Sequence, residues 1–256
     1  MTKKIIIANW KMNLLQAGAV LLTKDLIGEL GSLPDKVDIV LCASFTSLDA
    51  ISELIKGTNI KLGAQNVFWE NKGAYTGEIS PSMLGEWGVK YSIVGHSERR
   101  ENLGETDIMV NKKVRAALEN NLVPIICIGE TKEERKRGKK KIVVKKQLLA
   151  ALKDIKLDGI KEIVIAYEPV WVIGTGKPVQ PEDAEEMHEM IDKELVKLYS
   201  GAEREKYFRI IYGGSVDSGT APAFFAQKLI DGSLVGAASL RLNEFVEIIK
   251  AAVPQK

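Results

Sequence analysis

Four polar side chains stand at or just beyond the ends of apolar runs in this 256-residue sequence, at positions where a fold could bring them together. They are Asn9, Lys11, His96 and Glu168. A carboxylate can take a proton from the carbon beside a carbonyl group when a donor such as imidazole meets the charge that develops on the carbonyl oxygen. The lysine adds a fixed positive charge and the asparagine an amide. Together these groups indicate acid–base chemistry next to a carbonyl.

Each of these residues also has a structural interpretation. A glutamate at a strand end often caps a helix or joins an ion pair, a lone histidine often belongs to the packed core, and most lysines are solvated. The local sequence favours chemistry for Glu168, because Pro169 ends the strand and Trp171 begins a glycine-ended loop. Such a loop is typical of a flap that closes over a carboxylate and keeps water away. For His96, the residues that follow can begin a helix beneath the ring, which would keep the ring neutral.

Short apolar runs alternate with longer amphipathic patterns along the whole chain. The expected strands are Ile5–Trp10, Val37–Cys42, Ile60–Asn66, Tyr91–Gly95, Leu122–Ile128, Ile163–Glu168, Phe208–Tyr212 and Ser233–Gly236. The clearest expected helices are Leu14–Leu30, Thr106–Asn120, Lys139–Lys153, Pro181–Tyr199 and Leu242–Ala252. Strands that alternate with helices eight times in about 250 residues are typical of a closed parallel barrel. The sequence therefore predicts an α/β fold with a single (β/α)8 barrel domain over residues 1–256, and a doubly wound open sheet is the alternative.

Two loops of small residues follow the last two expected strands. Gly213-Gly214-Ser215 and Gly236-Ala237-Ala238-Ser239 look like the backbone-amide cradles that hold phosphate groups near helix N-termini. Each loop alone is a weak signal, because glycine-rich turns are common. Together they match the usual position of a phosphate in barrel enzymes, and they predict a phosphate site.

Composition argues against several other classes of protein. A formal net charge of +2 gives no reason to expect a nucleic-acid or membrane partner, and no export signal is expected at the N-terminus. Cys42 and Cys127 lie in strand-like runs and are expected to be buried thiols of a cytoplasmic protein. No metal site is expected from two histidines without ligand spacing. The basic stretch 132–146 contains glutamates and no aromatic residue, which favours a solvated helix face over an anion-binding patch.

A series of motifs resembles the triosephosphate isomerase family over essentially the whole chain. The matching blocks are Ala8–Asn13, Gly63–Asn66, Gly95–Arg100, Cys127–Thr131, Ala166–Gly176, Tyr212–Val216 and Val235–Leu240. The resemblance implies interconversion of glyceraldehyde 3-phosphate and dihydroxyacetone phosphate through an enediolate, as in glycolysis and gluconeogenesis. It implies neither a cofactor nor a metal.

The same resemblance implies a role for each matching residue. Glu168 would be the base, and neutral His96 would polarise the carbonyl and shuttle protons between the two oxygens. Lys11 would offset negative charge with support from Glu98, and Asn9 would hold a substrate oxygen. The phosphate would lie on backbone amides, those of Gly174, Ser215, Gly236 and Ala237.

Two positions in the lid and the cradle depart from the residues usual in this family. Glu130 is expected to contact the lid hinge around Trp171, and Pro169 is expected to belong to the lid. Val172 stands where alanine is usual and adds bulk near the lid tip, and Ala237 stands where a second glycine is usual. Alanine keeps the backbone amide, but a positive φ at this position would cost about 1 kcal/mol. We expect these departures to affect lid closure and phosphate affinity rather than the fold.

The resemblance also implies a homodimer. The loop 66–78, with Thr76 near its tip, would insert beside Asn9 and Lys11 of a second copy, and its aromatic residues suit an interface better than a free loop. Two alternatives remain, a different phosphate-binding barrel enzyme and a non-catalytic binding protein with this fold. The first is disfavoured by the matching amide, lysine, histidine and glutamate, and only the two departures favour the second.

Overall fold

The eight expected strands are all present, and they close into a barrel. The computed structural model describes residues 3–31, 33–174 and 178–254. In it β1 pairs with β2 on one side and with β8 on the other, all in parallel, which excludes the open sheet. The strands are β1 (Ile5–Asn9), β2 (Asp38–Ala43), β3 (Lys61–Ala64), β4 (Tyr91–Val94), β5 (Val123–Ile128), β6 (Ile163–Tyr167), β7 (Phe208–Tyr212) and β8 (Gly232–Val235). Their bounds lie within two residues of those expected.

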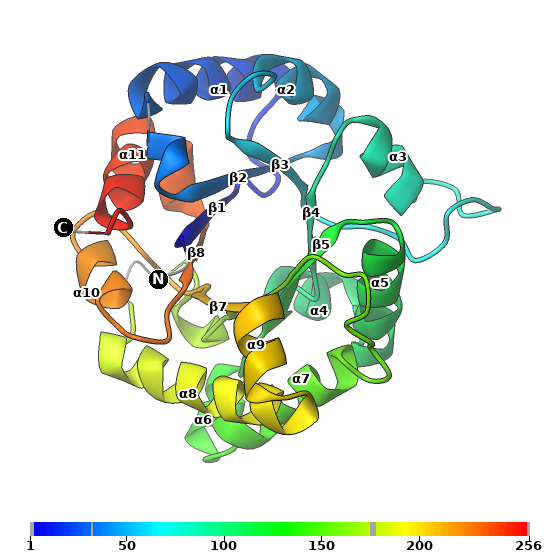
Figure 1. Ribbon diagram of the computed structural model, residues 1–256, viewed down its shortest axis with the longest axis vertical. Coiled ribbons are helices and arrows are strands. Elements are labelled where there is room, and N and C mark those ends of the chain that lie inside the picture. The colour runs from blue at the N-terminus through cyan, green and yellow to red at the C-terminus, as the bar shows by residue number, and fades with distance from the viewer. Residues whose placement is uncertain (1–2, 32, 175–177, 255–256) are drawn as a thin grey trace.

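Helices surround the barrel on its outside (Figure 1). Within the described residues they are α1 (Gln16–Leu30), α2 (Leu48–Leu54), α3 (Pro81–Glu86), α4 (Ser97–Leu103), α5 (Asp107–Glu119), α6 (Lys132–Lys136), α7 (Lys140–Ala151), α8 (Pro181–Leu198), α9 (Gly201–Tyr207), α10 (Ala221–Phe225) and α11 (Leu242–Ala251). Short 3₁₀ segments are η1 (Leu33–Asp35), η2 (Phe45–Ser47), η3 (Val170–Val172) and η4 (Ala237–Leu240). In the described ranges, no helix is both long and apolar enough to span a membrane.

The core has two layers, because alternate residues of a strand point to opposite sides of the sheet. The inner layer fills the barrel and consists of Ile5, Ile7, Val40, Cys42, Tyr91, Ile93, Val123, Ile125, Cys127, Val164, Ala166, Ile211 and Leu234. The outer layer packs the other face of the strands against the helices. Burial inside the barrel raises the pKa of both cysteine thiols, Cys42 and Cys127. Neither thiol is therefore suited to act as a nucleophile.

Ion pairs close the amino-terminal end of the barrel. Arg209 in β7 donates from Nη1 to Oδ2 of Asp38, at the start of β2, and from Nη2 to Oε2 of Glu162, just before β6, both at 2.7 Å. Nη2 also lies 3.4 Å from the hydroxyl of Tyr91, at the start of β4. Side chains at this end of such a barrel serve stability, which leaves the carboxyl end of the strands for chemistry.

The loop between β3 and α3 projects away from the barrel, at the right of Figure 1. Phe68 stacks on Trp69 with 4.1 Å between ring centroids and lies 4.7 Å from the ring of Tyr75. The backbone N–H of Phe68 donates to the carbonyl of Ile79 at 2.9 Å and ties the two ends of the loop together. The loop, with Thr76 exposed near its tip, is thus ordered by its own contacts.

Candidate active site

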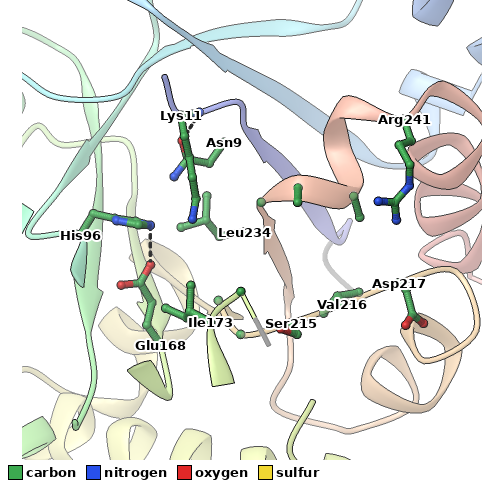
Figure 2. A pocket seen from close by; sticks show the side chains of 16 residues that line it. Asn9, Lys11, His96, Glu168, Ile173, Ser215, Val216, Asp217, Leu234 and Arg241 are labelled. Atoms are coloured by element: carbon green, nitrogen blue, oxygen red, sulfur yellow. Dashed lines mark hydrogen bonds and ion pairs between the residues drawn. The ribbon is translucent and has the colours of Figure 1, made fainter. Parts of the chain in front are cut away.

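The four polar side chains singled out in the sequence converge on one cavity at the carboxyl ends of the strands. The cavity has a volume of about 290 Å³. Figure 2 shows Asn9, Lys11, His96 and Glu168 on one side of it, with the labelled Ser215 on the other. The small residues of the expected phosphate cradle also line it, namely Gly174, Ser215, Gly236 and Ala237. The structure therefore brings both parts of the expected site together.

Glu168 is buried and fixed at the end of β6. Its backbone N–H donates to the carbonyl of Ile128 at 2.8 Å, and its side-chain oxygen Oε2 accepts from the backbone N–H of Ser97 at 3.0 Å. The other oxygen, Oε1, lies 3.2 Å from Nε2 of His96 but outside hydrogen-bond geometry. Gly213 leaves the necessary room, because a Cβ there would lie 2.8 Å from Cγ of Glu168. One carboxylate oxygen is thus anchored and the other faces the imidazole.

His96 directly precedes α4 and caps it. Its Nδ1 accepts a hydrogen bond from the backbone N–H of Glu98 at 3.2 Å. A ring nitrogen that accepts a hydrogen bond carries a lone pair, so this contact assigns the neutral ring with its proton on Nε2. The ring therefore presents an N–H donor to Glu168 and to the cavity.

Buried charges hold the residue before His96. Gly95 has a φ of +72°, its N–H donates to Oε1 of Glu105 at 2.7 Å, and its carbonyl accepts from Nε of Arg100 at 2.7 Å. Oε2 of Glu105 also accepts from Nζ of Lys113 at 2.5 Å. Burial alone would raise the pKa of the Glu105 carboxyl, but the charge of Lys113 and the hydrogen bonds it accepts hold that pKa below its usual range. An ionised carboxylate thus fixes the backbone that carries the imidazole.

Lys11 adopts a left-handed backbone conformation with a φ of +51°, which is uncommon for a residue other than glycine and costs energy. Its N–H donates to Oδ1 of Asn9 at 3.1 Å, and its carbonyl accepts from Nε2 of Gln65 at 2.9 Å. Its Nζ lies 2.5 Å from Oε1 of Glu98, and this ion pair joins the two side chains. These contacts direct the ammonium group into the cavity beside Asn9 (Figure 2).

The cradle and the lid both line the cavity and are joined by a hydrogen bond. Gly236 precedes η4, and Ala237 begins it without a positive φ, so the alanine brings no left-handed strain to the cradle backbone. Gly174 does have a φ of +74°, a conformation that favours glycine. The hydroxyl of Ser215 donates to the carbonyl of Val172 at 2.8 Å and joins the cradle to the lid.

Comparison with known proteins agrees with this geometry. The family description Triosephosphate isomerase matches residues 4–252. The chain belongs to the triosephosphate isomerase family. A curated triosephosphate isomerase from Caldanaerobacter subterraneus subsp. tengcongensis is 48% identical over 249 residues, which cover 97% of this chain and 99% of that protein. Those from Dictyoglomus thermophilum and Chloroherpeton thalassium are each 47% identical, over 98% of this chain and 100% of theirs.

The base of the lid in this family member is anchored to Glu130, as expected. Oε1 of Glu130 accepts from Nε1 of Trp171 at 3.0 Å, and Oε2 accepts from the hydroxyl of Tyr167 at 3.1 Å. The guanidinium of Arg135 lies 4.5 Å from the centroid of the Trp171 ring and 3.3 Å from Oε1 of Glu130. Val172 is buried in the outer core layer. Its extra bulk is therefore packed against the outer core layer.

Three supporting residues were not recognised from the sequence. They are Gln65, Glu105 and Arg135, and each contacts a residue far along the chain or on another element. Gln65 stands in a block that matches the family, which is the one signal that could have pointed to it. Arg135 belongs to the basic stretch expected to be solvated, whereas it packs on the lid. Pro169 lies where expected, directly before η3, and lid residues 175 and 176 lie outside the described residues.

Proposed function

We propose that this chain interconverts glyceraldehyde 3-phosphate and dihydroxyacetone phosphate, the reaction of the family to which it belongs. One barrel domain over residues 1–256 carries the site. The pair formed by Glu168 and His96, 3.2 Å apart, is the observation that carries the proposal. The pair faces a cavity whose other wall consists of glycine-rich and alanine-rich loops suited to a phosphate. The reaction needs no cofactor or metal, because acid–base groups suffice for a proton transfer between neighbouring carbons.

Glu168 is the base in this proposal. It takes a proton from the carbon beside the carbonyl, the electron pair moves to the carbonyl oxygen, and the protonated Glu168 then returns the proton to the neighbouring carbon. The 3.2 Å between Oε1 of Glu168 and Nε2 of His96 leaves no room for a substrate atom. The substrate oxygen therefore replaces Oε1 beside the imidazole. The carboxylate turns toward the carbon and gives up its hydrogen bond to the N–H of Ser97.

His96, Asn9 and Lys11 stabilise the charge that this step creates. The Nε2–H of His96 donates to the developing enediolate oxygen and moves protons between the two oxygens. The side-chain amide of Asn9 holds an oxygen, and the ammonium group of Lys11 offsets negative charge on substrate and intermediate. Glu98 keeps Lys11 in place through the 2.5 Å contact. Donors fixed before the reaction are effective because they need no reorganisation as charge develops.

The cradle and the lid hold the phosphate and protect the intermediate. The backbone amides of Gly174, Ser215, Gly236 and Ala237 bind the phosphate oxygens. Closure of the lid, whose described part runs from Pro169 to Gly174, excludes water from the enediolate. An enediolate phosphate that is exposed to water expels its phosphate, so the closed lid protects the product. The hydrogen bond between Ser215 and Val172 supports this coupling of cradle and lid.

We also propose that the active form is a homodimer in which the loop 66–78 of each copy packs beside Asn9 and Lys11 of the other. Exposed apolar side chains support this, because Met12 is 98% exposed and Leu15 is 85% exposed in one copy. Tyr75 in the projecting loop is 45% exposed. Light scattering at assay concentration should give a dimer, and Thr76→Arg should yield a poorly active monomer. A fully active monomer would contradict the dimer proposal.

A cytoplasmic location without a nucleic-acid or membrane partner completes the proposal. Both cysteines, Cys42 and Cys127, are free and buried, as thiols are in a reducing compartment. The small net charge of +2 supports the lack of a polyanionic partner. Passage through heparin at physiological salt is the expected result, whereas strong retention would contradict it.

A coupled spectrophotometric assay tests the proposed activity. Purified protein should turn over glyceraldehyde 3-phosphate, and 2-phosphoglycolate, which mimics the enediolate phosphate, should inhibit competitively. His96→Asn should lower kcat more than it raises KM, because the partner of the ring is the charge in the transition state. Tight 2-phosphoglycolate binding without turnover would instead mean that this chain is a binding protein with the same fold.

A further inference from the structure

An arginine at the mouth of the cavity has no part in the isomerisation described above. Arg241 lines the cavity together with Asp217, on the side away from His96 and Glu168 (Figure 2). Its side chain is exposed, and it forms no hydrogen bond or ion pair with another side chain or backbone group in the described ranges. The guanidinium is therefore available to a ligand.

The other charges around the cavity do not favour a phosphate dianion. Lys11 is paired with Glu98 at 2.5 Å, and Glu168 and Asp217 both add negative charge to the lining. Among the described residues that line the cavity, Arg241 is the one lysine or arginine without a carboxylate partner. Without it, an approaching dianion would meet a mouth whose charged side chains are mainly negative.

Both walls of this mouth are fixed relative to the phosphate cradle. Arg241 follows η4, which begins at the cradle, and its N–H donates to the carbonyl of Ala238 at 3.2 Å. Its carbonyl accepts from the N–H of Phe245 in α11 at 2.9 Å. On the other wall, the N–H of Ser218 donates to Oε1 of Glu244 at 2.6 Å, which ties the loop after β7 to α11. The backbone of Arg241 is thus held in place while its guanidinium remains free to reorient.

Asp217 is fixed as well. Its Oδ1 accepts from both the N–H and the hydroxyl of Thr220 at 2.8 Å. These contacts keep a carboxylate in the lining of the cavity, where it repels a phosphate group. A cationic side chain that is free to move can offset the repulsion between the Asp217 carboxylate and an approaching phosphate group. It can then turn to the phosphate once the ligand is bound.

We propose that Arg241 binds the phosphate group of the substrate, as the cationic side chain of a cradle otherwise made of backbone amides. This inference rests on the proposed function, since it assigns Arg241 to one end of the same substrate. The guanidinium attracts the dianion to the mouth and donates paired hydrogen bonds to its oxygens once it is seated. Arg241 therefore contributes to the selection of phosphorylated over unphosphorylated trioses.

Matched variants test this role. Arg241→Gln removes the charge, Arg241→Lys keeps it, and Arg137→Gln makes the same change at an exposed arginine that follows α6 and does not line the cavity. We expect Arg241→Gln to raise the KM for glyceraldehyde 3-phosphate about fivefold. This factor corresponds to the upper end of the range measured for solvent-exposed ion pairs. The ratio of kcat/KM for glyceraldehyde 3-phosphate to that for D-glyceraldehyde should fall by a similar factor. Arg241→Lys should recover most of the loss.

Two further readouts separate this role from a structural one. Added salt should lower kcat/KM less steeply in Arg241→Gln than in the wild type or Arg137→Gln. Calorimetry should show weaker binding of 2-phosphoglycolate to Arg241→Gln, a comparison that needs no turnover. Unchanged KM, salt dependence and binding in Arg241→Gln would overturn the inference, as would equal effects in Arg137→Gln. A wild type that binds 2-phosphoglycolate but has no isomerase activity would contradict only the proposed function.

Discussion

The buried pair formed by Glu105 and Lys113 offers a test of how the fold positions His96. The variant Glu105→Gln removes the carboxylate charge and keeps the size of the side chain. The side chains of Glu105 and Lys113 are 1% and 2% exposed, so the variant leaves a buried ammonium group without its counter-charge. Loss of one partner of such a pair costs about 3–5 kcal/mol. Lys113 keeps its hydrogen bond to Oδ1 of Asn66 at 2.7 Å, and we therefore expect about 3 kcal/mol.

The effect on activity depends on the hydrogen bond between Glu105 and the backbone of Gly95. Oε1 accepts from the N–H of Gly95 at 2.7 Å, directly before His96. The side-chain oxygen of Gln can still accept this hydrogen bond, whereas Glu105→Ala leaves the N–H without an acceptor. A buried donor without a partner costs about 1–3 kcal/mol. If this cost appears as a displaced imidazole, kcat should fall about tenfold in Glu105→Ala, with KM little changed, and less in Glu105→Gln.

Urea unfolding followed by circular dichroism at a fixed protein concentration measures the loss in free energy of unfolding. A double-mutant cycle with Lys113→Met isolates the interaction, because removal of both charges should recover part of the loss seen in Glu105→Gln. The reasoning is refuted if Glu105→Gln unfolds within about 0.5 kcal/mol of the wild type, the range of an ordinary surface substitution. It is also refuted if the two charge removals are simply additive. Wild-type kcat in Glu105→Ala would refute the link to His96.

Three other predictions follow from single contacts. Burial lowers the pKa of His188 to about 4. As the pH falls below about 6.5, the ring is therefore protonated in the unfolded chain but stays neutral in the folded one until the pH nears 4. The free energy of unfolding should therefore drop by roughly 3 kcal/mol between pH 7 and pH 4 through this residue, and a His188→Gln variant with an equally steep drop would contradict it. Gly213→Ala places a Cβ 2.8 Å from Cγ of Glu168, and kcat should fall about tenfold or more; steady-state kinetics with unchanged kcat would exclude this. Trp171→Phe loses the 3.0 Å hydrogen bond to Glu130 and should increase release of inorganic phosphate per turnover, measured by a phosphate assay, whereas an unchanged ratio would argue against an anchoring role.

The elements of the fold were largely predictable from local pattern, but closure of the barrel was not. The buried strand β7 (Phe208–Tyr212) coincides with its apolar run at both ends, because strands covered on both faces are continuously apolar. Closure depends on the pairing of β1 with β8, in which Ile5 lies beside Gly232. No local pattern records a contact across most of the chain, so the open sheet remained an alternative until the pairing was known.

The groups that touch the cavity were more predictable than those that support them. Glu168 and His96 end strands next to helix-start and lid signals, and these signals are local. Glu105, in contrast, acts through the backbone of Gly95, and its partner Lys113 is identified only by tertiary packing. The burial of Val172 likewise depends on how the lid base packs. Sequence shows which residue types are present but not which side chains the fold will bury.

Proton NMR of triose phosphate isomerisation in heavy water tests the central claim most directly. The claim is that Glu168 moves the proton between neighbouring carbons. Wild-type protein and the control Glu189→Gln, which alters an exposed ion pair on α8, should isomerise glyceraldehyde 3-phosphate with deuterium entering the exchanged carbon. Glu168→Gln should lose this activity by several orders of magnitude while it still binds inorganic phosphate. Turnover and deuterium incorporation near the wild-type level in Glu168→Gln would contradict the account.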